Sequence, residues 1–264
     1  LILSGTTTQF ISPGIFTDNT LPILTINNQS GVTLNNNLVV TQTLSINSNS
    51  SLSVSPGNFL NVSGNIYNNA GLSGLILQSN PDGNGTLINE TVSVPATVEL
   101  DLTGGLATTG YRFHYFVPPV LSNFIGTDSI SVKANLGLQH FNGDLVAYNE
   151  TLAESEQTDG WKYYDGYPSG TTAPEPFNEL ISTRGYNIYL TDNDKITFKG
   201  ILNSAAHTFS LNYTSANASP GWNLIGNPFP CSYDLQGITE LSTDEDDGID
   251  NTVYFTKDGD YLYW

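Results

Sequence analysis

The chain has 264 residues, of which 12% are charged, and Asp and Glu outnumber Lys and Arg by 25 to 7, so the net charge is -18. A negative field of this size repels nucleic acid and anionic membranes, which excludes polyanions as partners. Cys231 is the only cysteine, so an intramolecular disulfide and a cysteine-based metal site are excluded as well. No apolar stretch is long enough for a membrane-spanning helix.

Short strand signatures recur along residues 1–92 at a spacing of about 20 residues. One set begins at Leu24, Val32 and Leu38, and the same apolar–polar–apolar pattern returns at positions 44, 52 and 60. A period that contains three short strands predicts a three-sided parallel β-helix, because equivalent strands of successive coils must stack. A meander of antiparallel hairpins in a sandwich is the alternative.

Stacked coils would bury apolar side chains in continuous columns. Leu24, Leu44 and Ile66 would lie above one another, with coils about 4.8 Å apart. Asn tolerates left-handed backbone and its amide can form ladders, so we expect corners at or near Asn27, Asn35, Asn47, Asn61 and Asn65. No Asp, Glu, Lys, Arg or His occurs between positions 20 and 79, which argues against a catalytic groove on this wall.

Longer strands with many aromatic residues follow a turn cluster at positions 80–85. The expected strands are 97–102, 111–117, 145–149, 160–164, 185–190, 195–200, 207–213, 222–226 and 252–263. None has a sustained 3.6-residue apolar period, so we expect little helix. The sequence therefore predicts an all-β chain, with a parallel β-helix-like segment at 1–92 followed by an antiparallel β-sandwich domain at 93–264.

Catalytic patterns are missing from the sequence. There is no Gly-x-Ser-x-Gly elbow, and the three histidines, at 114, 140 and 207, show no zinc-ligand spacing. Carboxylates cluster at Glu150, Glu154 and Glu156, but this polar run is typical of an exposed loop. We predict that the protein is not an enzyme.

One aromatic stretch is a candidate ligand site. In the segment 161–168, WKYYDGYP, aromatic faces could stack on sugar rings, which makes glycans a candidate partner. The candidate platform consists of Trp161, Tyr164 and Tyr167. Packing inside a sandwich explains the same alternation of side chains and is the alternative.

The densest acidic run, at 243–251, is a candidate calcium site. Its carboxylates could wrap Ca²⁺ with oxygen ligands, although the spacing does not match the EF-hand loop. The candidate ligands are Asp244, Asp246, Asp247 and Asp250. A solvated loop is the alternative, and no other cofactor is predicted.

The segment 221–230, GWNLIGNPFP, resembles a module of large secreted and surface proteins of Bacteroidota that are exported by the type IX secretion system. The motifs at 111–120, 185–189, 198–203, 233–235 and 251–255 also resemble that family. The resemblance implies an extracellular or outer-surface location and a C-terminal sorting domain beyond Trp264, so we expect the chain to be a piece of a longer precursor. The resemblance implies no particular catalytic activity. Ser129, in Asp128-Ser129-Ile130, resembles the short O-glycosylation signal of these bacteria.

Two functions follow as hypotheses. The first is a secreted structural or adhesive protein of the cell surface that pairs with copies of itself or with other surface proteins, in an extracellular layer or fibre, through exposed strand edges. The second is a carbohydrate-binding module of a secreted polysaccharide-using machine. Within the motif GWNLIGNPFP we expect a strand that enters a rigid corner, with Trp222, Leu224 and Ile225 buried.

Overall fold

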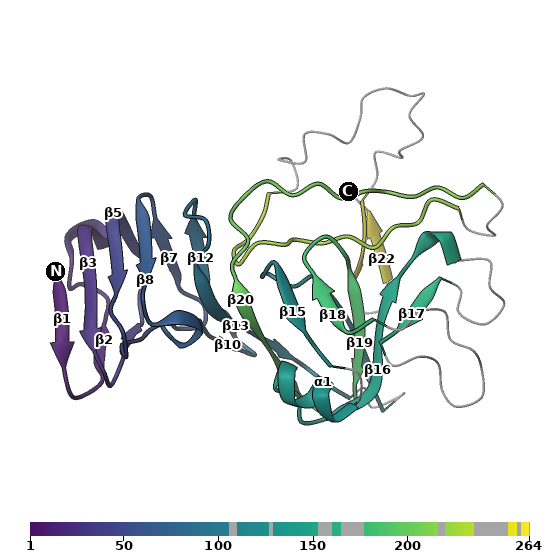
Figure 1. Cartoon of the computed structure of the whole chain (residues 1–264), viewed down its shortest axis with the longest axis horizontal. Helices are drawn as coiled ribbons and strands as arrows, with labels where there is room; N and C mark the ends of the chain where they lie inside the picture. Colours follow the sequence, from purple (N-terminus) through teal and green to yellow (C-terminus); the bar gives the residue numbers. More distant parts are fainter. Residues whose placement is uncertain are drawn as a thin grey trace, which may run out of the picture. The chain divides into compact units, whose positions relative to one another are not determined.

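The computed structural model describes residues 1–105, 110–126, 129–152, 160–164, 177–215, 220–234, 253–257 and 260–263. The protein is nearly all β, with 46% strand and 7% helix. Parallel stacked coils form its first part and antiparallel sheets follow, as the sequence predicts (Figure 1). Backbone contacts divide the chain into two compact units, Leu1–Cys231 and Ser232–Trp264.

The stacked coils are built from two parallel sheets. In the first sheet the order is β1 (Ile2–Gly5), β3 (Thr20–Asn28), β5 (Leu38–Ile46), β7 (Phe59–Val62) and β12 (Thr86–Asn89), with β8 (Asn65–Asn68) also paired to β5. In the second sheet the order is β2 (Gln9–Ile11), β4 (Val32–Leu34), β6 (Leu52–Val54), β9 (Leu75–Leu77), β13 (Pro95–Leu102) and β20 (Asp194–Ile201).

The first sheet turns a corner, so each coil has three sides. The first part of β5 pairs with β7 and its second part pairs with β8. Because β7 and β8 are separate strands, they form two rows, and the second sheet provides the third. All pairs between successive coils are parallel, so the hairpin alternative is wrong for this segment.

Apolar columns fill the coils. Leu24 lies opposite Leu44, and Leu44 lies opposite Ile66, so the three side chains stack in register and all are buried. The other two rows have equivalent columns, formed by Val32, Leu52 and Leu75 and by Leu38, Leu60 and Leu87. No single coil can bury these side chains alone, so the stacking itself stabilises the segment.

Amide side chains connect the corners. The Nδ2 atom of Asn47 donates to Oδ1 of Asn27 at 3.1 Å, and the Oγ atom of Ser55 donates to Oδ1 of Asn35 at 2.6 Å. Both pairs are 20 residues apart in sequence, which is one coil. Asn61 and Asn65 belong to strands β7 and β8 rather than to a corner of this kind.

Strand β13 is the point where parallel pairing changes to antiparallel pairing. It pairs with β9 in parallel and with β20 in the antiparallel sense, from Pro95 opposite Ile201 to Leu102 opposite Asp194. The last coil is therefore followed directly by a strand from the second half of the sequence.

A four-stranded antiparallel sheet follows, in the order β14 (Arg112–Phe116), β19 (Tyr186–Leu190), β16 (Phe141–Tyr148) and β17 (Trp161–Tyr163). Phe116 of this sheet packs on Phe198 of β20, with ring centroids 5.8 Å apart, so the two sheets share a core. Smaller elements complete the chain: η1 (Thr17–Asn19), η2 (Gly71–Ser73), β10 (Ser79–Asn80), β11 (Gly83–Asn84), β15 (Ser122–Phe124), α1 (Ser129–Leu136), η3 (Glu150–Leu152) and β18 (Glu179–Ile181). In the second unit, β21 (Tyr254–Lys257) pairs with β22 (Asp260–Tyr263).

The structure of the motif GWNLIGNPFP differs in two ways from the buried strand that the sequence predicts. Neither 207–213 nor 222–226 forms a regular strand. The side chain of Asn223 instead joins the two segments: its Oδ1 accepts from the Asn212 amide and its Nδ2 donates to the Asn212 carbonyl. The expectation that Trp222 and Ile225 are buried is wrong, since Trp222 is 48% exposed and Ile225 is also exposed.

The second half of the motif is a structural corner, as expected. Pro228 and Pro230 are buried. Asn203 Nδ2 donates to the Pro228 carbonyl at 2.7 Å, and the Leu87 amide of β12 donates to the Pro230 carbonyl at 2.9 Å. The corner therefore ties the end of the first unit to its last coil.

Candidate functional site

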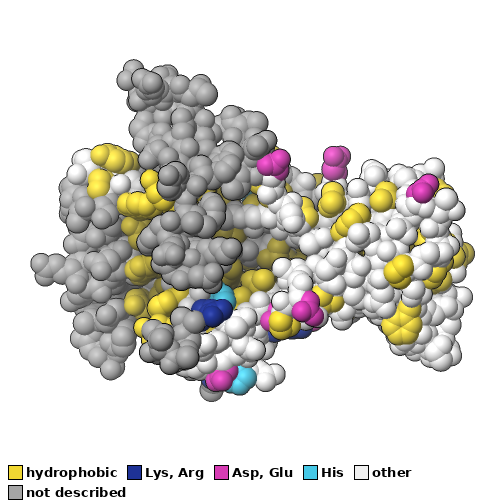
Figure 2. All heavy atoms as spheres, turned by 180° about the vertical axis from the view of Figure 1, so that it is seen from behind, with side chains coloured by type: hydrophobic (Ala, Val, Ile, Leu, Met, Phe, Trp, Pro, Cys, Tyr) yellow, Lys and Arg dark blue, Asp and Glu magenta, His cyan; other side chains and the backbone are white. Residues whose placement is uncertain are grey.

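Between positions 20 and 79 the outer walls of the coils are neutral. Between positions 20 and 79 the outward side chains are mostly Thr, Ser and Asn, and no charged residue occurs. Figure 2 shows this part as a largely uncoloured surface with scattered hydrophobic side chains. Such walls provide hydrogen-bonding groups but neither acids nor bases.

Among the residues that the structure describes, the two sheets of the coils end at β1 and β2, and each of these strands has one described neighbour. Two apolar side chains beside these edges point outward, Ile2 with 67% and Phe10 with 56% exposure. Unpaired backbone groups next to exposed apolar side chains are the features that template strand addition.

An aromatic face covers the outer side of the four-stranded sheet. Tyr186 and Ile188 of β19 point into the core, so Asn187 and Tyr189 point outward, together with Phe113 and Tyr115, which lie opposite them on β14. Phe113 is 53% exposed and its ring centroid is 5.9 Å from that of Tyr189.

Trp161 links the two edge strands of this face. Its ring centroid lies 6.4 Å from that of Tyr115 with nearly parallel planes, and 5.2 Å from that of Tyr148. Between these strands Asn187 is buried, and its Oδ1 has no hydrogen-bond partner. Partly exposed aromatic rings on this face can stack on the apolar face of a ligand.

The structure separates the three aromatic residues predicted from sequence. Trp161 lies on the aromatic face, whereas Tyr164 is only 1% exposed and cannot stack on a ligand. Tyr167 lies outside the described residues. Tyr115 and Tyr148 were missed, although the alternation of Phe113 and Tyr115 in RFHYF was a signal for one aromatic strand face.

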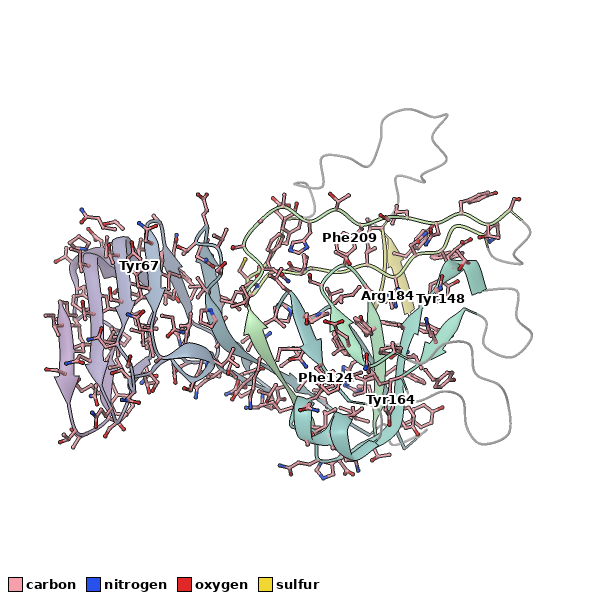
Figure 3. All side chains as sticks on the ribbon, in the orientation of Figure 1. Tyr67, Phe124, Tyr148, Tyr164, Arg184 and Phe209 are labelled. Carbon is pink, nitrogen blue, oxygen red and sulfur yellow. The ribbon has the colours of Figure 1, made fainter. Side chains whose placement is uncertain are left out.

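A cavity of about 260 Å³ opens beside Tyr148. Its walls come from three segments: the end of β16 with η3, the turn after β18, and the ribbon formed by residues 208–212 and 223–225. Figure 3 labels Tyr148, Arg184 and Phe209, one residue from each segment. No sequence signal could have joined these segments, because they are distant along the chain.

Glu150 anchors the ribbon through Thr214 and Gly221, which lie next to its two segments. This carboxylate is buried, and it accepts from the Thr214 amide at 2.7 Å, the Thr214 hydroxyl at 2.8 Å and the Gly221 amide at 3.0 Å. Its oxygens thus have a structural role, and the donors offset much of its charge. The expectation of a solvated carboxylate is wrong for Glu150, while Glu154 and Glu156 lie outside the described residues.

The structure does not describe the side chains of the other predicted sites. The candidate calcium ligands Asp244, Asp246, Asp247 and Asp250 lie outside the described residues, and only the backbone of Ser129 is described, at the start of α1. In the described part of the chain, no group of three or more His, Cys, Asp and Glu could hold a metal ion. No helix among the described residues is long and apolar enough to cross a membrane.

Burial shifts the pKa of two histidines and of the single cysteine. Burial lowers the pKa of His114, whose Nε2 lies 2.7 Å from the Thr103 carbonyl oxygen, and burial also lowers the pKa of His207. Burial raises the pKa of the Cys231 thiol, which makes the reactive thiolate scarcer.

Comparisons with protein-family models, curated proteins and solved structures give no match for this chain.

Proposed function

We propose that this protein is a secreted structural or adhesive protein of the bacterial surface, in which the stacked coils form a neutral spacer that assembles through its open edges. The observation that carries the proposal is the combination of a wall without charges between positions 20 and 79 with two strands, β1 and β2, that are the outermost of their sheets among the described residues. The resemblance of GWNLIGNPFP to surface proteins exported by the type IX system supports the extracellular location.

The edge geometry supports the choice of β1 as an assembly strand. The amino group of Leu1 donates to the Ile23 carbonyl, and the Leu1 carbonyl accepts from the Thr25 amide. Since backbone groups alternate in direction along a strand, the amides of Ile2 and Ser4 point to the open side. The expected partner is an edge strand of another copy or of another surface protein.

Mass in solution as a function of concentration tests this proposal. We expect assembly that rises with concentration and is abolished by Ser4→Pro, which removes an outward amide without removing a bond to β3. Ser4→Ala is the matched control and should assemble normally. A monomer at all concentrations, or equal assembly of the two variants, would contradict assembly through β1.

A second function, saccharide binding, is favoured by the aromatic face. Sugar rings present apolar C–H faces, which suit the rings of Tyr115 and Trp161. Glycan-array binding that is lost in Trp161→Ala, with an unchanged melting temperature, would support this function. Tyr67→Ala is the control, because Tyr67 is an exposed aromatic residue on the coils.

A further inference from the structure

The cavity beside Tyr148 combines apolar walls with neutral polar groups. The rings of Tyr148 and Phe209 and the side chains of Ile181 and Leu224 line it. The hydroxyl groups of Thr208 and Ser210 also line it, and neither makes a hydrogen bond to a described residue. A volume of about 260 Å³ suits a ligand of monosaccharide size and lies just below the usual range for ligand pockets, about 300–1,000 Å³.

Arg184 gives the cavity a cationic group. It is the one Lys or Arg among the lining residues, and its guanidinium forms no ion pair or hydrogen bond with any described residue. Glu150, the acidic residue of the lining, has its oxygens occupied by Thr214 and Gly221. A guanidinium with free donors binds a carboxylate in a two-bonded, planar geometry.

The charge of the whole chain favours a ligand with few negative charges. A net charge of -18 opposes a polyanion, whereas one anionic group beside one guanidinium is compatible with it. Aromatic and aliphatic walls suit the C–H face of a sugar ring, and Thr208 and Ser210 can bond its hydroxyl groups.

We propose that this cavity binds a sugar that carries one carboxylate, such as a terminal uronic acid of an otherwise neutral glycan, with Arg184 holding the carboxylate. This proposal deepens the saccharide-binding function by naming a ligand class and a second site. It does not depend on assembly through β1.

Methyl-resolved NMR titration of the whole chain with a matched pair of sugars tests the proposal. Methyl β-glucuronide should shift the methyl signals of Ile181 and Leu224 and bind at least about tenfold more tightly than methyl β-glucoside. Arg184→Gln should abolish this difference. Arg112→Gln, a substitution outside the lining residues, is the control and should leave the difference unchanged.

The comparison of the two sugars on the unmodified protein decides the question even if Arg184→Gln does not fold. Equal affinity for both sugars, or binding of neither, would overturn the proposal. If the sugars shift the indole N–H signal of Trp161 and leave the cavity methyls unchanged, the aromatic face is a sugar site and the cavity is not. If the methyls alone respond, the cavity is the site and the aromatic face is not.

Discussion

Replacement of Gly64 by Ala is the sharpest test of how closely successive coils approach. Gly64 lies between β7 and β8, at the corner where the chain crosses Gln42 of the previous coil. A Cβ atom at this position would collide with the Gln42 carbonyl oxygen and would lie 2.5 Å from the Gln42 carbonyl carbon and 2.8 Å from its Cα. These are backbone atoms, so the conflict cannot be relieved by a side-chain rotation.

The cost follows from the shift that this collision requires. Carbon atoms in ordinary contact lie about 3.5–4.0 Å apart, so the corner must open by about 1 Å. Overpacking of this kind costs about 1–3 kcal/mol. The opening also strains the neighbouring bond from the Ser63 amide to the Val40 carbonyl, now 3.0 Å, which contributes about 0.5–1.5 kcal/mol. We therefore expect Gly64→Ala to lower the free energy of unfolding by about 2–4 kcal/mol.

Gly57→Ala is the matched control. Gly57 has a φ of +75°, but a Cβ atom there meets nothing within 4 Å. Its replacement carries only the backbone cost of a left-handed residue, about 1–2 kcal/mol. Urea denaturation followed by circular dichroism measures both variants against the unmodified chain. Equal losses in the two variants, or a loss below about 0.5 kcal/mol for Gly64→Ala, would refute the close approach of the coils.

Three further outcomes are expected. Burial lowers the pKa of His114 below its ordinary value of 6.5, so near that pH the unfolded chain binds more protons than the folded chain. The melting temperature should therefore fall as the pH decreases from 7 to 5.5. Melting curves of His114→Gln should show a smaller fall. Burial raises the pKa of Tyr186 to about 12, so its hydroxyl is neutral near pH 7 and accepts a hydrogen bond from the Ile181 amide. Tyr186→Phe should lower the free energy of unfolding, measured by urea denaturation, by about 1–2 kcal/mol. An unchanged free energy of unfolding would contradict a stabilising role for this bond. Glu150→Ala should speed hydrogen exchange at the Thr214 amide by about tenfold or more, and unchanged exchange would show that the carboxylate does not anchor the ribbon.

Much of the stacked-coil architecture could be predicted from the sequence because its contacts repeat at nearly constant separation. Leu24, Leu44 and Ile66 are about one coil apart, and each has at least one polar neighbour that marks an outward position. A fixed period with inward apolar residues leaves few other ways to bury them. The antiparallel character of the second half could also be predicted, from alternation in segments such as 111–117 and 185–190.

The candidate binding surfaces could not be predicted in this way. Tyr115 and Trp161 lie on strands at opposite edges of one sheet, and sequence distance gives no measure of their 6.4 Å separation. Likewise, the alternation in WKYYDGYP assigns Trp161 and Tyr164 to different strand faces but does not say which face is covered; packing against the core decided that Tyr164 is buried.

The sequence by itself determined the period, the inward columns and the neutral walls, because these depend on local alternation and on neighbours about one coil away. Only the tertiary structure decided that Trp222 is exposed, that the Asn223 side chain joins two segments, and that Tyr148 and Arg184 line one cavity. These features depend on which distant segments pack together, and the free energy of that packing is shared among many side chains that no single stretch of sequence contains.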